Sequence, residues 1–469
     1  MAEQESIPTT PITPPQTLEV DDELLADIVD LIRSQSENAL RNIVNDLFPE
    51  DVAHLLNRMD YEDAQYLFLR LPTEVGSQVL PELNDELRER FLDWLSQEQI
   101  TELVEEMPSD DATDIVSELP KDKAEEVLEE LSDEDSSELA ELLQYDESTA
   151  GGIMQKEVIT VKKTDTVKRA IQAVRRAARE KNEQLYTIYV IDEKNLLVGS
   201  LPVADLILLP PSRRIYKVME PDVIHVRTNV DQEEVAKIFK KYNIISLPVT
   251  DFAGHLVGRI TIDDVVDVIT EEASEDILRM GGVSEDEHIS TTPLIALRRR
   301  LPWLYINLAT AFLASSVVAM FAGTIEHVVI LAALMPIVAG MGGNAATQTI
   351  TVIVRGIALG EITDANRKRA LYKELRIGLM NGVANGVLTG TVIGIFNKNA
   401  VLGLVICMAM VINMFVAGMA GTIVPLTLKW LKIDPALASA VIVTTFTDVF
   451  GFASFLGLAT LLLKFLLPS

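Results

Sequence analysis

The sequence predicts a multidomain fold: an all-α helical-repeat N-domain, a tandem pair of α+β units and an all-α membrane domain of five transmembrane helices. Three observations predict it. A helical repeat fills the first third of the chain, an α+β sequence then occurs twice, and five apolar stretches follow, each near the ~20 residues that a membrane-spanning helix needs. We therefore expect a soluble body joined to a membrane body.

The N-terminal part begins with a Pro/Thr-rich tail, 1–20, which we expect to be disordered. An apolar residue then recurs every 12 residues, at Leu47, Met59, Leu71, Leu83, Leu95, Met107, Leu119 and Leu131. A breaker and an acidic cluster follow each one and start the next short helix, which predicts a stacked solenoid. Most of its carboxylates fit a solvated surface, whereas Asp110 and Asp114, one turn apart, are better candidates for metal ligands.

Two copies of one sequence follow. Residues 154–161 reappear as 219–226, and residues 190–205 reappear as 249–264. Each copy reads strand, helix, strand, turn, strand, helix, so the arrangement resembles a tandem pair of CBS domains. That family often binds adenine nucleotides through a motif that Gly258, Thr261 and Asp264 match. The first copy has Pro202 where the hydroxyl should be, and a hydroxyl one turn before an acid also fits a plain helix cap.

The last helix of the second copy continues without a breaker from Ile262 to Arg279. Helical geometry places Asp264, Asp267, Glu271 and Glu275 in one stripe, with Glu272 and Asp276 beside it. Like charges at this spacing destabilise a helix unless cations or an opposing surface neutralise them. Clustered carboxylates suit a hard, oxygen-seeking cation, and the alternative interpretation is a merely solvated acidic face.

The two parts of the chain carry net charges of opposite sign. Residues 1–290 carry 64 acidic and 27 basic side chains, whereas residues 291–469 carry 6 and 13. The acidic body argues against nucleic acid as a partner and favours a cation. No phosphate-cradling loop motif is present, and only five histidines occur, so we expect neither an ATP-driven pump nor an enzyme. Cys407, the single cysteine, excludes disulfide frameworks within one chain.

Five apolar stretches make the expected spans, at Leu301–Thr324, Val328–Val354, Ile377–Phe396, Val401–Leu428 and Pro435–Leu463. Basic residues precede the first span, separate the second from the third, and follow the fourth. The positive-inside rule therefore predicts a multi-pass protein of the inner or plasma membrane, with cytoplasmic soluble domains and the C-terminus outside. No cleavable signal peptide is evident.

Asp448 is the only charged side chain between Asp434 and Lys464. A carboxylate at that depth normally faces a watery, protein-lined path for ions, although a protonated or paired carboxyl that serves packing alone is the alternative. In the second span, Gly342 and Gly343 precede Asn344 within a Pro- and Gly-rich run. We expect this run to bare backbone carbonyls to a water-filled cavity, the alternative being close helix packing.

At these motifs the chain resembles the MgtE family of magnesium transporters and channels over nearly its whole length. The resemblance rests on Glu147–Met154 and on Gly342-Gly-Asn344 with Gln348. It also rests on Asp434-Pro-Ala and on Asp448 with the residues that flank it. It implies an N-domain at 21–146, CBS domains at 147–212 and 213–273, a connecting "plug" helix at 274–297 and a pore domain at 298–469.

The resemblance also implies roles for individual residues. The pore metal site would comprise Asp448, Asn344, Gly342, Gly343, Thr444 and, at the cytosolic mouth, Asp434. The regulatory metal site would comprise Asp264, Asp267, Glu272, Glu275, Asp276, Asp110 and Asp114. The resemblance implies a homodimer with the pore on the two-fold axis, conducting Mg²⁺ inward and closed by cytosolic Mg²⁺, with ATP as a candidate modulator. A carrier of cobalt or manganese, or a membrane-tethered sensor that conducts nothing, are the rival hypotheses.

Overall fold

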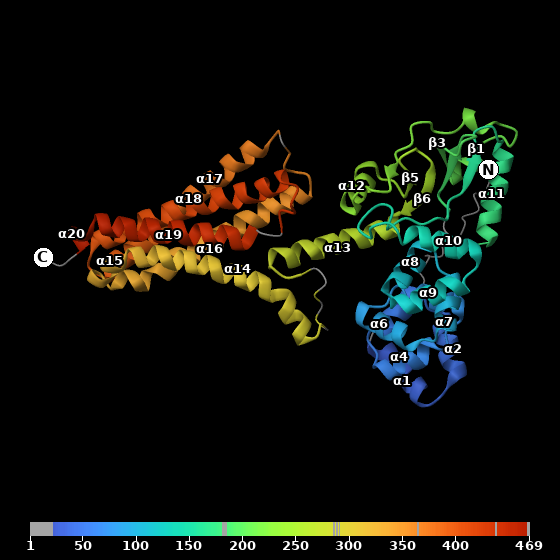
Figure 1. Cartoon of the computed structure of the whole chain (residues 1–469), viewed down its shortest axis with the longest axis horizontal. Coiled ribbons are helices and arrows are strands. Elements are labelled where there is room, and N and C mark those ends of the chain that lie inside the picture. Colours follow the sequence, from blue (N-terminus) through green and yellow to red (C-terminus); the bar gives the residue numbers. More distant parts are fainter. Residues whose placement is uncertain are drawn as a thin grey trace, which may run out of the picture. The chain divides into compact units, whose positions relative to one another are not determined.

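The computed structural model describes residues 22–180, 185–284, 287, 289, 291–363, 365–436 and 439–466. The predicted disordered tail, 1–20, lies outside these residues. The chain divides into two compact units, Met1–Ile269 and Thr270–Ser469. Figure 1 shows the short helices and two small sheets of the first unit and the long helices of the second.

The described part of the first unit begins with ten short helices. They are α1 Asp22–Arg33, α2 Glu37–Asn45, α3 Pro49–Leu56, α4 Tyr61–Phe68, α5 Thr73–Val79, α6 Asp85–Trp94, α7 Gln97–Glu105, α8 Ser109–Glu118, α9 Lys121–Glu130 and α10 Asp133–Leu142. Breakers and caps start them: Pro49 occupies a first-turn position, and Ser96 forms a capping box with Gln99. The eight residues of the 12-residue register all pack in or against one continuous core, which confirms the predicted helical repeat.

Two three-stranded sheets follow, and their topologies match. The first copy comprises β1 Thr160–Lys162, α11 Val167–Glu180, β2 Thr187–Ile191, β3 Leu197–Pro202 and the 3₁₀ turns η1 Val203–Ile207 and η2 Ile215–Lys217. The second comprises β4 Val226–Arg227, α12 Gln232–Tyr242, β5 Ser246–Thr250, β6 Leu256–Thr261 and α13 Ile262–Met280. In each sheet the central strand pairs in parallel with the first strand and antiparallel with the third, with an irregularity at the same place. The predicted α+β repeat is confirmed.

The two copies exchange their first segments. Gln155, which precedes the first sheet, pairs with Arg259 of β6, and Glu220, which precedes the second, pairs with Ser200 of β3. Glycines permit the approach: a Cβ on Gly258 would lie 2.8 Å from the Gln155 carbonyl oxygen, and one on Gly199 would lie 2.7 Å from the Met219 sulfur. Each copy therefore completes the other.

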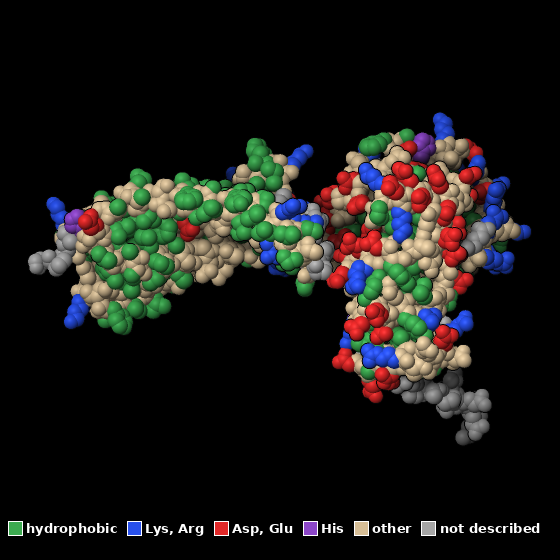
Figure 2. Space-filling view, turned by 60° about the horizontal axis from the view of Figure 1, so that its bottom comes forward, with side chains coloured by type: hydrophobic (Ala, Val, Ile, Leu, Met, Phe, Trp, Pro, Cys, Tyr) green, Lys and Arg blue, Asp and Glu red, His purple; other side chains and the backbone are tan. Residues whose placement is uncertain are grey.

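Within the residues that the structure describes, the second unit contains five helices that are long and apolar enough to cross a membrane. Its elements are α14 Pro293–Met320, α15 Ala322–His327, α16 Ile330–Ala358, α17 Arg367–Phe396, α18 Ala400–Trp430, α19 Ser439–Leu461 and α20 Leu463–Leu466. Apolar side chains cover much of the visible surface of this unit, whereas acidic ones crowd that of the first (Figure 2). The prediction of five spans is confirmed.

Several predicted boundaries differ from the structure, among them the start of the third span, which lies at Arg367 rather than Ile377. The first span extends back to Pro293 and ends at Met320, because the backbone leaves the helical conformation at Phe321. The fifth begins at Ser439 rather than Pro435. The expected connecting helix over 274–297 is not one helix: α13 ends at Met280, and Gly282 follows with a φ of +71°, a conformation that favours glycine and ends the helix.

Helix α18 is held by a seam of glycines on α17. Gly378, Gly382, Gly386 and Gly390 recur every four residues and face α18, where an added Cβ would lie only 2.5–2.7 Å from atoms of the α18 backbone. Such small residues let two membrane helices approach closely. The seam makes α18 the buried centre around which α16, α17 and α19 pack.

Candidate cation sites

The membrane candidate is built on α16 and α19, which pack against each other. Thr444 and Asp448 lie one turn apart on α19, and both are half-buried. Asn344 lies on α16 and is exposed in the single chain, as is Gln348 one turn later. The arrangement offers one carboxylate, a hydroxyl and amide oxygens, which suit a hard cation that keeps most of its hydration shell.

The expectation of bared carbonyls in the second span is wrong. Helix α16 continues through Pro336 and the glycines, so the backbone at Gly342 and Gly343 is helical. The Gly343 carbonyl also accepts a hydrogen bond from Thr347 Oγ1, at 3.1 Å. Gly342 is buried because Asn413 of α18 packs against it, which matches the alternative interpretation of close helix packing.

Asp434, predicted at the cytosolic mouth, is engaged by a basic residue. Its Oδ2 accepts from Arg279 Nη1 of α13 at 2.6 Å, and its Oδ1 accepts from the Ala436 backbone N–H at 2.8 Å. Arg279 also forms an ion pair with Glu275. A guanidinium thus lies between two carboxylates that the resemblance assigns to metal. Sequence reasoning missed Arg279, although its position four residues after Glu275 is the signal that could have found it.

In the first unit, acidic residues of α8 and α13 come together. Burial and repulsion from Asp110 raise the pKa of Asp264 to about 8. Burial raises the pKa of Asp110 to about 6, and desolvation with repulsion from Asp110 raises that of Asp114 to about 7. Burial and repulsion from Asp263 also raise the pKa of Asp267. Burial therefore disfavours the charged form of each predicted regulatory residue of this unit, and Asp110 adds repulsion at Asp114 and Asp264.

Two further carboxylates join this group. Burial and repulsion from Asp110, Asp264 and others raise the pKa of Asp111 well above its ordinary value. Desolvation and repulsion from Asp267 raise the pKa of Glu82, which lies between α5 and α6. The sequence analysis missed both because the 12-residue repeat offers a similar acidic cluster in every unit. Only the tertiary packing distinguishes Asp111 and Glu82 from the other acidic residues of the repeat.

A buried hydrogen-bond chain connects the N-domain to the second α+β copy. Arg259, 2% exposed, donates from Nε to Gln155 Oε1 at 2.8 Å. Gln155 in turn donates from Nε2 to Asp110 Oδ2 at 2.9 Å. Asp110 is 8% exposed, so its carboxylate is buried beside a fixed donor. This contact, which no local sequence signal indicates, holds α8 against the strand segment that precedes the first sheet.

The three residues of the nucleotide motif have structural partners. Asp264 Oδ2 accepts from Thr261 Oγ1 at 2.8 Å and from the Thr261 backbone N–H at 3.1 Å, which caps the start of α13. Gly258 has no Cβ, which leaves room for the Gln155 backbone to lie against it. The structure therefore gives all three the plain structural role that the sequence left open, which does not conflict with a nucleotide nearby.

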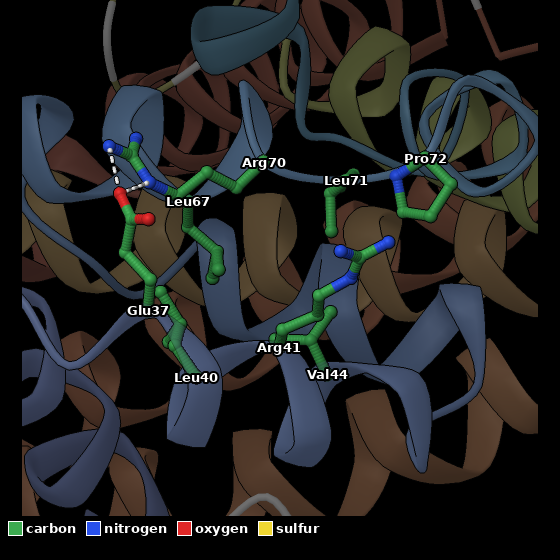
Figure 3. Close-up of a pocket in the computed structure, with 8 residues that line it drawn as sticks. All are labelled: Glu37, Leu40, Arg41, Val44, Leu67, Arg70, Leu71 and Pro72. Atoms are coloured by element: carbon green, nitrogen blue, oxygen red, sulfur yellow. Dashed lines mark hydrogen bonds and ion pairs between the residues drawn. The ribbon is translucent and has the colours of Figure 1, made fainter.

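The remaining regulatory candidates, Glu272 and Asp276, are half-buried on α13 in the second unit. Among the described residues, no group of three or more His, Cys, Asp or Glu side chains is close enough to hold a metal ion. The carboxylates gather without forming a preformed metal site within one chain. A cavity of about 150 Å³ between α2 and α4, which the Glu37–Arg70 ion pair borders (Figure 3), contains none of the predicted site residues.

Comparisons with known proteins agree along the chain. Residues 335–458 match the MgtE family, described as a divalent cation transporter, residues 47–148 match the MgtE intracellular N domain, and residues 150–211 and 215–271 match the CBS domain. The five apolar helices and these matches thus define a multi-pass membrane transporter with intracellular N and CBS domains.

Relatives identify the family. The magnesium transporter MgtE of Thermus thermophilus is 37% identical over 324 residues, 68% of this chain and 71% of that protein. MgtE of Enterococcus faecalis is 34% identical over 321 residues, 68% of this chain and 70% of that protein. This chain belongs to the MgtE family of magnesium transporters. The cytosolic domain of the Mg²⁺ channel MgtE, solved in complex with ATP, is 33% identical with a TM-score of 0.50, and covers 52% of this chain and 99% of that one.

A likeness to an enzyme is limited to a short segment. Inosine-5'-monophosphate dehydrogenase of Thermoplasma acidophilum is 40% identical over 77 residues, which is 16% of this chain and 16% of that enzyme. The match is far shorter than those to the transporters. Membership of a transporter family agrees with the expectation that the chain is not an enzyme.

Proposed function

We propose that this chain is a magnesium-selective channel or transporter that carries Mg²⁺ into the cell down its electrochemical gradient. The observation that carries the proposal is Asp448, a lone half-buried carboxylate on α19 beside α16, in a chain 37% identical to a magnesium transporter. A single charge in the membrane attracts a divalent ion without binding it too tightly to leave. The domain boundaries that the resemblance implies, apart from a single connecting helix over 274–297, are part of the same proposal.

A homodimer with the pore on its two-fold axis would explain the exposed polar residues of α16. Asn344 and Gln348 are exposed in the single chain, within a helix long and apolar enough to span the membrane. Amide groups facing lipid are costly, so a second copy that covers this face, or water between the copies, would satisfy them. Symmetry would then bring together two Asp448 carboxylates and two Asn344 amides around one ion.

Regulation by cytosolic Mg²⁺ follows from the crowded carboxylates. Asp110 repels both Asp114 and Asp264, and the raised pKa values of the three carboxyls mean that their charged forms are disfavoured in this arrangement. Bound Mg²⁺ would neutralise them and hold the N-domain on the second CBS domain. Glu272, Glu275 and Asp276 would extend the regulatory site along α13. Without the ion, repulsion would separate these elements and favour the open pore.

We also propose that ATP binds the CBS pair and modulates this regulation, because the similar cytosolic domain was solved with ATP. Thr261 and Asp264 would then serve both as helix cap and as ligand, with Gly258 giving room. Calorimetry of the full chain in detergent, with Mg²⁺ held constant, tests this. Absence of heat with millimolar ATP would leave the three residues a structural role alone.

Flux through the purified protein in liposomes tests the main proposal. Mg²⁺ entry should follow the imposed gradient and should be lost when Asp448→Asn removes the charge. Competition by Co²⁺ and Mn²⁺ in the same assay separates magnesium selectivity from the broader divalent-cation transport that the family description allows. A protein that binds Mg²⁺ but passes no ion would be a sensor, and the proposal would fail.

A further inference from the structure

Asn413 is an amide side chain buried in the middle of α18. It is 1% exposed, and its Nδ2 donates to the Val338 carbonyl oxygen of α16 at 2.9 Å. Its Oδ1 is buried and has no hydrogen-bond partner within the described part of the chain. A polar atom buried without a partner opposes folding, so an aliphatic side chain of similar size would be the better choice for packing alone.

Glycines on two neighbouring helices make room for this amide. A Cβ on Gly342 of α16 would lie 2.1 Å from Asn413 Nδ2, and one on Gly451 of α19 would lie 2.7 Å from the same atom. Both distances are far below van der Waals contact, so neither position accepts a larger residue while Asn413 is in place. The amide thus fills a gap to which α16 and α19 each contribute a glycine.

Both glycines adjoin the candidate pore residues. Gly342 lies two residues before Asn344, and Gly451 lies one helical turn after Asp448. The hydrogen bond to Val338 fixes how far α16 can slide along α18, and the contact with Gly451 fixes how closely α19 approaches. The glycines of α17 pack closely against α18 and hold this helix in place, so Asn413 projects from a fixed helix.

We propose that Asn413 is a positioning residue that sets the spacing between Asn344 and Asp448, and thereby the ion selectivity of the pore. This inference rests on the proposed function. Asn413 is buried within one chain and does not reach the ion, so it acts only through the two helices. Mg²⁺ is small and demands near-ideal octahedral geometry, so its discrimination from the larger Ca²⁺ depends on groups held at a constant separation.

Asn413→Leu tests the proposal because it keeps the branching and the number of side-chain heavy atoms and removes both polar atoms. In liposomes, the ratio of Mg²⁺ to Ca²⁺ flux should fall roughly tenfold, as expected when site groups move by a fraction of an ångström. The matched control is Asn385→Leu on α17, since Asn385 Nδ2 donates to the Asn381 carbonyl oxygen of its own helix, and its flux ratio should stay unchanged. An unchanged ratio in Asn413→Leu, or an equal fall in the control, would overturn the proposal.

A second variant separates positioning from packing. Gly451→Ala should impair the protein because its methyl group meets the amide, and adding Asn413→Ala should restore a stable, folded chain by emptying the gap. The ratio of Mg²⁺ to Ca²⁺ flux in that double variant should be as low as in Asn413→Leu, because Asn413→Ala also removes the hydrogen bond to α16. Recovery of both stability and ratio would show that Asn413 serves packing alone.

A distance measurement distinguishes failure of this inference from failure of the proposed function. Spin labels at Val352→Cys of α16 and Phe446→Cys of α19, two exposed positions, report the helix spacing in a Cys407→Ala chain diluted with unlabelled protein. Asn413→Leu should broaden the distance distribution even if no Mg²⁺ passes, which would support positioning while refuting transport. An unchanged distribution in a conducting protein would refute positioning.

Discussion

The membrane unit and the soluble unit differ in how their acidic side chains are arranged: one carboxylate stands alone in the fifth span of the membrane unit, whereas several lie together in the soluble unit. Between Asp434 and Lys464 the membrane chain carries one charged side chain, Asp448, on helices otherwise packed through glycines. In the soluble unit, carboxylates of α8 and α13 lie close together, and burial and repulsion raise their pKa values. A site that passes an ion must let it leave, whereas a site that senses an ion benefits from groups that are unstable without it.

The largest effect is expected at the single membrane charge. Asp448→Ala should abolish Mg²⁺ uptake, a loss of roughly a hundredfold or more if the ion loses its only intramembrane counter-charge. Growth of an uptake-deficient strain on low magnesium measures it, with Glu326→Gln of α15 as the control acid outside α16 and α19. If the Asp448→Ala protein fully restored growth, the membrane charge would not be needed for transport, and the contrast with the soluble unit would fail.

The crowded carboxylates should control closure rather than conduction. Neutralising Asp264, Asp267, Glu272, Glu275 and Asp276 together should leave the channel partly open at millimolar Mg²⁺, because the ion loses its ligands. Reduced repulsion opposes this effect, but we expect the lost ligands to dominate because a bridging ion forms several charge-assisted contacts. Patch recordings with cytosolic Mg²⁺ stepped up to ~10 mM measure it. Closure like that of the unmodified chain would make the stripe a solvated face.

Arg279 offers a smaller test within the membrane unit. Arg279→Gln removes the cation between Glu275 and Asp434, leaving two carboxylates that oppose closure until Mg²⁺ replaces the guanidinium. The Mg²⁺ concentration for half-closure should rise roughly two- to fivefold, the range for a partly exposed ion pair worth up to about 1 kcal/mol. Lys368→Ala, an exposed basic residue on α17, is the control. A half-closure concentration that does not move would show that the guanidinium is incidental.

The smallest effect is expected from pH in magnesium-free protein. Asp110, Asp114 and Asp264 have pKa values raised to about 6, 7 and 8, so the assembled cluster binds protons that the separated elements release. The stability of the assembly is therefore greatest below the ordinary aspartate pKa of about 4 and falls as the pH rises from there to about 8. Protection from proteolysis in chelator should fall between about pH 4 and pH 8.

Magnesium supplies the complementary result. Because Mg²⁺ binds deprotonated carboxylates, adding it should restore protection at pH 8 and should release protons. Asp264→Asn should flatten the pH dependence, since the group with the highest of these pKa values no longer titrates. Protection that does not vary with pH in chelator would mean that the carboxylates of α8 and α13 do not repel one another in the assembled protein.

Periodicity and composition predicted most of the architecture. The 12-residue register, the duplicated α+β sequence and the five apolar stretches depend on local patterns, and all three appear in the structure. Boundaries were less well predicted: α14 begins at Pro293, before the apolar stretch that starts at Leu301, and α13 ends at Met280, before Gly282. Charge patterns were also sufficient to single out Asp448 and the acidic stripe of α13 as candidate sites.

The sequence alone determined which residues could bind a cation, because a carboxylate in an apolar span or a helical stripe of acids is costly wherever the chain folds. Only the tertiary structure decided which of them meet. It selected Asp111 and Glu82 from a repeat full of acids, and it brought Arg279 to Asp434, 155 residues away. It also placed Asn413 against Gly342 and Gly451. These contacts join segments distant in sequence, and packing, which no local pattern encodes, sets them.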